Sequence, residues 1–347
     1  MLSFMNDYSE GACVEILKLL EDTNTMQHAG YGMDSICEEA KAYIKKELEN
    51  ELAEIHFLTG GTQTNKTVIA AALRPYEAVI AVDTGHIHVH ETGAIENSGH
   101  KVITVKGVAG KMLPEAIDKV VEEHTDEHMV KPAMVYISNS TELGTIYTKQ
   151  ELEAISRKCK EHGLILFLDG ARLGSALMAC DNDIKMRDLA QLCDIFYIGG
   201  TKNGALLGEA VIILQDRLKE NFRYYIKQNG GMLAKGWILG IQFLGLFQEG
   251  AFYRLAEHAN RCADILRKGL KELGIPMLVE TTTNQIFPIF SNELLEDLEK
   301  EVKMSIWERV DRESTAVRMV TSWNTKEEDV EKLLSLLEDL RLQKEKS

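Results

Sequence analysis

The sequence predicts an α/β fold with a mostly parallel sheet, followed by a smaller α+β region. Short apolar runs alternate with amphipathic helices from about Glu54 to Asn229, as in repeated βα units. From Leu239 the pattern changes to helix without intervening strands, and then to short strands flanked by helices. The 347 residues also exceed what one core usually holds. We therefore expect a large domain over residues 1–249 and a small C-terminal domain over residues 250–347.

Apolar runs that end in a turn or a polar residue predict the strands of the large domain. The predicted strands are Ile55–Leu58, Ala78–Val82, Lys101–Val105, Ala133–Ser138, Leu164–Leu168, Ile195–Ile198 and Ala210–Leu214. Amphipathic stretches predict the helices Ser35–Leu48, Thr64–Leu73, Pro114–Glu123, Lys149–Glu161 and Asp216–Gln228. Asp34 is expected to cap the first of these helices, since an aspartate side chain accepts hydrogen bonds from free N–H groups.

The C-terminal region is predicted to begin near Gly250, with a helix over Leu255–Leu273. Short strands follow around Met277–Val279, Gln285–Ile289 and Ala316–Val320, and a helix over Lys326–Leu340 closes the region. Because these elements do not alternate as βα units, the prediction for this region is α+β.

Composition restricts the class of partner. Asp and Glu number 54 against 39 Lys and Arg, which gives a net charge of −15 and opposes binding to nucleic acid or an anionic membrane. No window reaches the roughly 18 consecutive apolar residues of a spanning helix. We expect a small-molecule partner, with no nucleic acid and no membrane.

Cysteine use indicates the compartment. The six cysteines are scattered without a C-x-x-C pair, and no signal-peptide pattern opens the chain. We therefore expect reduced thiols in a cytoplasmic protein.

Two predicted strands lead into residues that suit an aldehyde cofactor, and the cofactor they predict is pyridoxal phosphate. The strand Leu164–Leu168 delivers Asp169 to its carboxyl end, where open α/β sheets bind ligands. A carboxylate there can keep a pyridinium nitrogen protonated. The strand Ile195–Ile198 leads into Gly199-Gly200-Thr201-Lys202-Asn203-Gly204, where the lysine amine can form a Schiff base. Taken alone, Asp169 and Arg172 also fit a helix N-cap with its ion pair, and Lys202 also fits a solvated loop lysine.

The loop Gly60-Gly61-Thr62-Gln63-Thr64-Asn65 lies between a predicted strand and a helix. Free backbone amides and hydroxyls at the positive end of a helix dipole make it a candidate phosphate site. The alternative is a glycine turn into a helix that Thr62 caps.

Three histidines, His86, His88 and His90, alternate in Thr84-Gly85-His86-Ile87-His88-Val89-His90. In an extended segment they would share one face, which leaves a zinc site as an alternative, although no fourth ligand stands at a familiar spacing. We favour His86 stacked on the cofactor ring, where it can exchange a proton with a substrate hydroxyl. A purely structural histidine is the remaining alternative.

Arg318 is a charged residue within the predicted strand Ala316–Val320. A bidentate guanidinium suits the α-carboxylate of an amino acid, and a structural salt bridge is the alternative.

In order along the chain, these motifs resemble the low-specificity threonine aldolase family, which belongs to the β-eliminating lyase superfamily of fold-type I pyridoxal phosphate enzymes. The resemblance covers nearly the whole length. The matching segments are Phe4-Met5-Asn6-Asp7-Tyr8-Ser9-Glu10-Gly11-Ala12, Tyr31-Gly32-Met33-Asp34, Gly60-Gly61-Thr62, His86-Ile87, Glu91-Thr92-Gly93-Ala94, Asp169-Gly170-Ala171-Arg172, Gly200-Thr201-Lys202-Asn203-Gly204 and Val317-Arg318-Met319-Val320-Thr321-Ser322.

The resemblance implies a fold-type I large domain, as in pyridoxal-phosphate-dependent transferases, with a smaller α+β C-terminal domain. It implies that Lys202 holds the cofactor, that Asp169 pairs with the pyridine nitrogen and that His86 stacks on the ring. Gly61 and Thr62 would bind the phosphate.

Further site residues follow from the same resemblance. Thr201 and Arg172 would also contact the cofactor, and Arg172, Arg318 and Asn6 would meet the substrate carboxylate. Family members are homodimers or homotetramers with shared active sites. Tyr31 at the substrate and Lys235 at the cofactor would then serve the neighbouring subunit's site.

The chain departs from the better-known branch of the family at Asn139-Ser140-Thr141-Glu142-Leu143-Gly144. That branch has Asn-Thr-His, whose histidine helps to handle the substrate hydroxyl, and Thr141 stands in its place here. Asn6 also stands where a serine is common. Substrate preference and stereochemistry at the β-carbon therefore stay open.

The expected reaction is retro-aldol cleavage of L-threonine or L-allo-threonine to glycine and an aldehyde, with Lys202, Asp169 and His86 as catalytic residues. A β-elimination or a transamination on the same cofactor is the second hypothesis. The third is a metal-binding or non-catalytic module that uses His86, His88 and His90.

Overall fold

A seven-stranded sheet forms the centre of the larger part of the molecule. The computed structural model describes residues 1–345. The strand order is β2-β8-β7-β6-β5-β3-β4. The pairs from β7 through β6, β5 and β3 to β4 are parallel, whereas β8 lies antiparallel between β7 and β2. The bounds are β2 (Glu54–Leu58), β3 (Glu77–Val82), β4 (Val102–Val105), β5 (Lys131–Ser138), β6 (Ile165–Asp169), β7 (Ile195–Gly199) and β8 (Glu209–Ile213). The predicted mostly parallel α/β sheet is confirmed.

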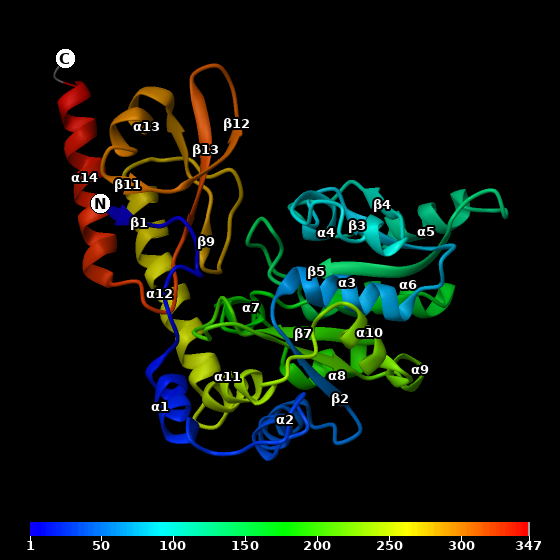
Figure 1. Cartoon of the computed structure of the whole chain (residues 1–347). Coiled ribbons are helices and arrows are strands. Elements are labelled where there is room, and N and C mark those ends of the chain that lie inside the picture. Colours follow the sequence, from blue (N-terminus) through cyan, green and yellow to red (C-terminus); the bar gives the residue numbers. More distant parts are fainter. Residues whose placement is uncertain (346–347) are drawn as a thin grey trace.

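Helices cover both faces of this sheet (Figure 1). The helices of this part are α1 (Val14–Thr23), α2 (Ser35–Leu48), α3 (Gly61–Ala72), α4 (His86–Val89), α5 (Pro114–Glu123), α6 (Lys149–His162), α7 (Leu173–Leu177), α8 (Met186–Leu192), α9 (Asp216–Lys219), α10 (Phe222–Gln228) and α11 (Trp237–Phe247). Side chains alternate between the faces along each strand. Ile137, Leu168 and Ile198 pack in one core with residues of α2, α6 and α11, whereas Tyr136 and Tyr197 pack with α3 and α10.

The C-terminal part packs two long helices against a small antiparallel sheet. It contains α12 (Ala251–Glu272), α13 (Asn292–Leu298), α14 (Glu327–Glu345), β9 (Gln285–Ile286), β10 (Ile289–Ser291), β11 (Val302–Lys303), β12 (Ser305–Arg309) and β13 (Ser314–Val320). The sheet has the order β10-β13-β12, and β9 also pairs with β13. These elements confirm the α+β expectation for this region.

The N-terminal strand packs with the C-terminal part rather than with the large sheet. β1 (Leu2–Ser3) pairs in parallel with β11, and Phe4 belongs to the same core as α12 and α14 residues. Figure 1 places β1 beside α14. The division of the chain near Gly250 stays a prediction, but these first residues lie away from the sheet of the domain to which they were assigned.

Three local expectations differ from the structure. The expected helix Asp216–Gln228 is divided into α9 and α10, because Asn221 between them has a φ of 60°. Helix α3 starts at Gly61 with Gly60 as its N-cap, so the Thr62 cap is wrong. Around Met277 there is only an isolated bridge to Pro288. The Asp34 cap is confirmed, since its side chain accepts a hydrogen bond from the amide of Cys37.

No helix within residues 1–345 is both long and apolar enough to cross a membrane.

Candidate active site

A cavity of about 290 Å³ opens where β6 and β7 end and α3 begins. It is lined by predicted site residues from four separate segments, namely Gly61, Thr62, His86, Asp169, Arg172, Thr201 and Lys202. A second cavity of about 280 Å³ is lined partly by the same side chains and also by Arg318 and Trp307. The fold therefore brings together residues that are up to 310 positions apart, from Tyr8 to Arg318.

Asp169 ends β6 and is the most heavily hydrogen-bonded carboxylate of the first cavity. The hydroxyls of Tyr136 and Tyr197 each donate to it over 2.5 Å. The amide of Ala171 and Nδ2 of Asn65 donate over 2.9 and 3.1 Å. Burial acts to raise the pKa of Asp169, but His86 and the tyrosine hydrogen bonds outweigh it and hold the pKa below its usual value. Asp169 is therefore an ionised acceptor at a ligand cavity.

Lys202 lies in the loop that joins the antiparallel strands β7 and β8. Burial and the nearby Arg172 guanidinium lower the pKa of its amine, which favours the neutral, nucleophilic form. Glu209 opens β8 and lines the same cavity, where burial raises its pKa to about 8. Its carboxyl accepts hydrogen bonds from the hydroxyl of Thr201 and the amide of Gly200.

The start of α3 supplies backbone amides at the other end of the cavity. Gly60 and Gly61 take the chain from β2 directly into the helix, and no side chain caps its first turn. A Cβ on Gly61 would lie 3.3 Å from the hydroxyl of Tyr197, so the glycine allows a close approach. These free N–H groups, with the exposed hydroxyl of Thr62, can bind an anion.

His86 is connected to Asp169 through two intermediate side chains. Its Nδ1 lies 2.8 Å from Oε1 of Glu91, and Nδ2 of Asn65 donates to the same oxygen over 2.7 Å. Asn65 also donates to Asp169. The imidazole is therefore held in a fixed orientation at the edge of the cavity.

The extended segment on which the zinc alternative depends is not present around His86. Residues His86–Val89 form the short helix α4, and His88 and His90 are exposed. The rings of His86 and His90 lie 5.5 Å apart at their centroids. A helix does not place alternate residues on one face, which removes the geometric basis of the zinc alternative.

Arg172 forms a buried bidentate ion pair with Asp7. Its Nε and Nη2 donate to the two oxygens of Asp7 over 2.7 and 3.0 Å. The alternative in which Arg172 pairs with Asp169 is therefore wrong. Burial acts to raise the pKa of Asp7, but the positive charges of Arg172 and Lys202 outweigh it and lower that pKa.

Arg318, on β13, faces the second cavity. Its guanidinium lies 5.6 Å from the centroid of the Trp307 ring, and its buried Nε has no hydrogen-bond partner in residues 1–345. Over the same residues it forms no salt bridge, so the structural ion pair is not the arrangement seen here.

Known proteins resemble this chain over nearly its whole length. A family model described as β-eliminating lyase matches residues 11–293. The chain belongs to the β-eliminating lyase family. The low-specificity L-threonine aldolase of Pseudomonas sp. (strain NCIMB 10558) is 32% identical over 335 residues, which cover 95% of each chain. That of Pseudomonas aeruginosa is 32% identical over 98% of this chain and 97% of its own.

Solved structures resemble this β-eliminating lyase over almost its whole length. A threonine aldolase from Leishmania major is 49% identical, has a TM-score of 0.97, and matches over 98% of this chain and 99% of its own. Aspartate aminotransferase from Thermus thermophilus is 16% identical with a TM-score of 0.74, over 98% of this chain and 96% of its own, and shows the fold alone. The predicted family and the fold-type I architecture are confirmed.

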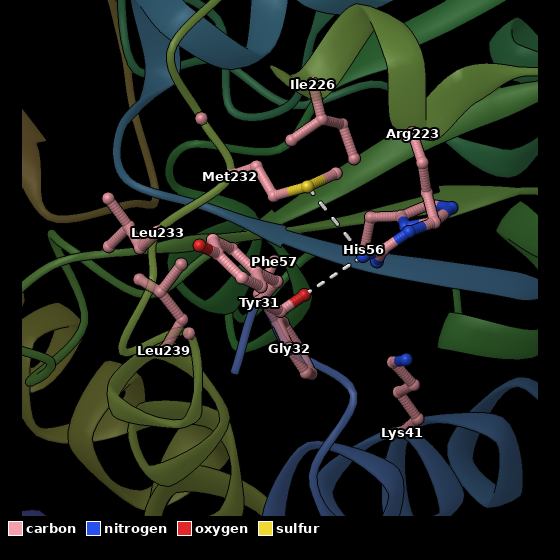
Figure 2. A pocket seen from close by; sticks show the side chains of 12 residues that line it. Tyr31, Gly32, Lys41, His56, Phe57, Arg223, Ile226, Met232, Leu233 and Leu239 are labelled. Carbon is pink, nitrogen blue, oxygen red and sulfur yellow. Dashed lines mark hydrogen bonds between the residues drawn. The ribbon is translucent and has the colours of Figure 1, made fainter. Parts of the chain in front are cut away.

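Three predicted site residues of this β-eliminating lyase lie outside both cavities of the single chain. Lys235 is exposed just before α11. Tyr31 lines a separate small pocket, where Arg223 donates to its carbonyl oxygen over 3.2 Å and contacts Sδ of Met232 (Figure 2). Asn6 uses its side-chain oxygen to accept from Tyr8 and Ser9.

Sequence reasoning missed several polar residues of the site. Asp7, Glu142 and Glu209 are carboxyls that the fold places around Lys202 and Arg172. Asn65, Tyr136 and Tyr197 hold Asp169. The sequence contained a signal for the two tyrosines, because side chains alternate along parallel neighbouring strands and this puts both tyrosines on the same face as Asp169.

Proposed function

We propose that this protein cleaves L-threonine or L-allo-threonine to glycine and an aldehyde, as a pyridoxal-phosphate-dependent aldehyde-lyase. The observation that carries the proposal is the meeting of Lys202, Asp169 and His86 in one cavity, in a chain related to low-specificity threonine aldolases over its whole length. The relatives' names do not favour β-elimination or transamination.

The side chains of the cavity fit pyridoxal phosphate. Lys202 offers an amine with a lowered pKa, and Asp169 offers an ionised carboxylate for a ring nitrogen. Gly61 and Thr62 offer an anion site at a helix N-terminus. The buried hydroxyl of Ser140 lines the cavity without a hydrogen-bond partner in the described chain, so polar capacity is left for a ligand. When bound, the cofactor supplies an electron sink for cleavage at the α-carbon.

The chain's own residues then orient the reacting groups. Asp169 keeps its negative charge through four hydrogen bonds, so that it can hold a ring proton. Glu91 fixes the imidazole of His86 beside it. Arg172 and Arg318 both line the second cavity and provide cationic groups for a substrate carboxylate.

The active sites are shared between subunits of a homodimer or homotetramer in this proposal. Tyr31 is half exposed, Lys235 is exposed, and both lie outside the cavities that hold Lys202. We assign both residues to the site of a neighbouring copy. The cytoplasm is the proposed compartment.

Replacement of Lys202 tests the proposed function directly. Lys202→Ala is expected to lose threonine cleavage by several orders of magnitude, together with the cofactor linkage that borohydride traps. Lys160→Ala, at an exposed position on α6, is the matched control and is expected to keep both. A Lys202→Ala protein that releases glycine from threonine at the native rate would remove the proposal. Pyruvate and ammonia formed without aldehyde would show elimination instead.

A further inference from the structure

Glu142 lies where the two cavities of the site meet. Five side chains line both cavities, namely Tyr8, His86, Glu142, Arg172 and Lys202. Asp169 and Glu209 line only the first cavity. Among the described residues, Glu142 is therefore the carboxyl common to the cavity that suits the cofactor and the cavity that contains Arg318.

The two oxygens of Glu142 have different surroundings. Oε1 accepts hydrogen bonds from the amide of His86 over 2.9 Å and from the hydroxyl of Ser138 over 2.8 Å. Oε2 is buried and has no hydrogen-bond partner among residues 1–345. A buried carboxyl oxygen without a donor is costly, unless a ligand supplies the donor. Oε1 anchors the group, and Oε2 is left for a ligand hydroxyl.

The neighbouring Thr141 does not offer this chemistry. Its hydroxyl is 2.7 Å from that of Thr145, and a hydroxyl is a poor base near neutral pH. His86 can also exchange protons, but its Nδ1 is already engaged by Glu91.

From this placement, and given the proposed aldol cleavage, we infer that Glu142 is the general base that accepts the β-hydroxyl proton of the substrate at Oε2. The electron pair of the O–H bond forms the aldehyde carbonyl as the Cα–Cβ bond breaks. The pair of that bond stays with the α-carbon, which takes up a proton to give glycine. Atoms and charge balance without a further reactant.

The electrostatic surroundings make the carboxylate of Glu142 a stronger base. Burial raises the pKa of Glu142, and the negative charge of Asp169 adds to this effect, against the hydrogen bond from Ser138. Other titratable or charged side chains face it across the second cavity from five segments of the chain, namely Tyr8, His86, His90, Arg172, Lys202 and Arg318.

The variant Glu142→Gln distinguishes a role of Glu142 in accepting a proton from a role in holding its neighbours His86 and Ser138 in place. The glutamine oxygen can still accept from His86 and Ser138, whereas the amide nitrogen replaces the oxygen that would take the proton. We expect kcat for threonine cleavage to fall by about 100-fold or more, as for the loss of a general base. The acidic limb of the kcat–pH profile, where wild-type activity rises as Glu142 ionises, is expected to be lost. Glu122→Gln, at an exposed position on α5, is the matched control.

Exchange of the glycine α-hydrogen in deuterated water is the second measurement. This reaction needs the cofactor and Lys202 but no hydroxyl proton, so Glu142→Gln is expected to keep it within a few-fold, with an unchanged cofactor absorption. Cleavage by Glu142→Gln at the wild-type rate overturns the inference alone. Equal loss of exchange and cleavage also overturns it, since Glu142 would then support the site as a whole. A wild-type protein that does not cleave threonine overturns the proposed function.

Discussion

Single residues of the site combine local sequence signals with partners that only the fold provides. Asp169 was predicted from its place after an apolar strand, and the structure gives it Tyr136 and Tyr197 as donors. Arg172 follows three residues later in the sequence, but its partner Asp7 lies in the N-terminal segment of the chain. The residue types indicate which groups can act as acid, base or ion, whereas their hydrogen-bond and ion-pair partners depend on the fold.

Glu209 gives a prediction for stability against pH. Its pKa is about 8 in the folded chain because it is buried, against about 4.3 in an unfolded chain. Between these values the unfolded state has lost a proton that the folded state keeps. The Glu209 contribution to the free energy of unfolding therefore falls as pH rises from about 4 to 8.

Urea denaturation at pH 5 and pH 8 measures this fall in the free energy of unfolding. Glu209→Gln can still accept the hydrogen bonds from Gly200 and Thr201, and it is expected to lose less stability than wild type between the two pH values. An exposed change on α6, Glu153→Gln, is the control and should follow the wild-type curve. Identical pH slopes for wild type and Glu209→Gln would contradict the assigned pKa.

At the scale of elements, the ends of the strands position more of the candidate site than the helices do. β6 and β7 are adjacent and parallel, so Asp169 and the Lys202 loop emerge at the same edge of the sheet. The loop after β6 and the end of β7 lie in close contact, because a Cβ on Gly170 would be only 1.9 Å from the carbonyl oxygen of Tyr197. The absence of a side chain at Gly170 is thus a condition for this geometry.

Helix α6 offers a stability prediction that is independent of the site. Thr148 caps the helix, and Glu151 accepts back from the amide of Thr148 over 2.8 Å in a capping box. Thr148→Ala is expected to lower the free energy of unfolding by about 1 kcal/mol. Thr148→Ser keeps the hydroxyl and is expected to lose much less. Denaturation in urea measures both, and a kcat for threonine cleavage that changes with Thr148→Ala would show that α6 affects the site.

At the scale of the whole molecule, the second cavity forms between the large sheet and the C-terminal part. Arg318 and Trp307 come from β13 and β12, whereas Lys202 comes from the loop between β7 and β8, and His86 begins α4. The short strand β1 joins the N-terminus to β11, and this brings Asp7 and Tyr8 to the same place. Residues from both parts of the chain are therefore needed to complete the cavity.

Shared sites in the proposed dimer can be tested by mixing two inactive variants. A Lys202→Ala subunit and a Tyr31→Ala/Lys235→Ala subunit would form a hybrid with one intact site. After dissociation and reassociation, threonine cleavage is expected to recover to ~25% of wild type, since about half of the dimers are hybrids and each has one of two sites. Each variant treated alone is the control. Mixtures with no more activity than the separate variants would place Tyr31 and Lys235 outside the site.

The amino-acid sequence alone predicts the fold class, the strands of the large sheet and a ligand site at Lys202 and Asp169. These follow from local patterns, since the period of apolar residues and the glycine-rich turns are properties of neighbouring positions. The packing of distant segments produces the Asp7–Arg172 pair, the tyrosine donors to Asp169 and the position of Glu142 between two cavities. Contacts between distant segments, and the burial that shifts the pKa of a carboxyl, exist only once the chain is packed.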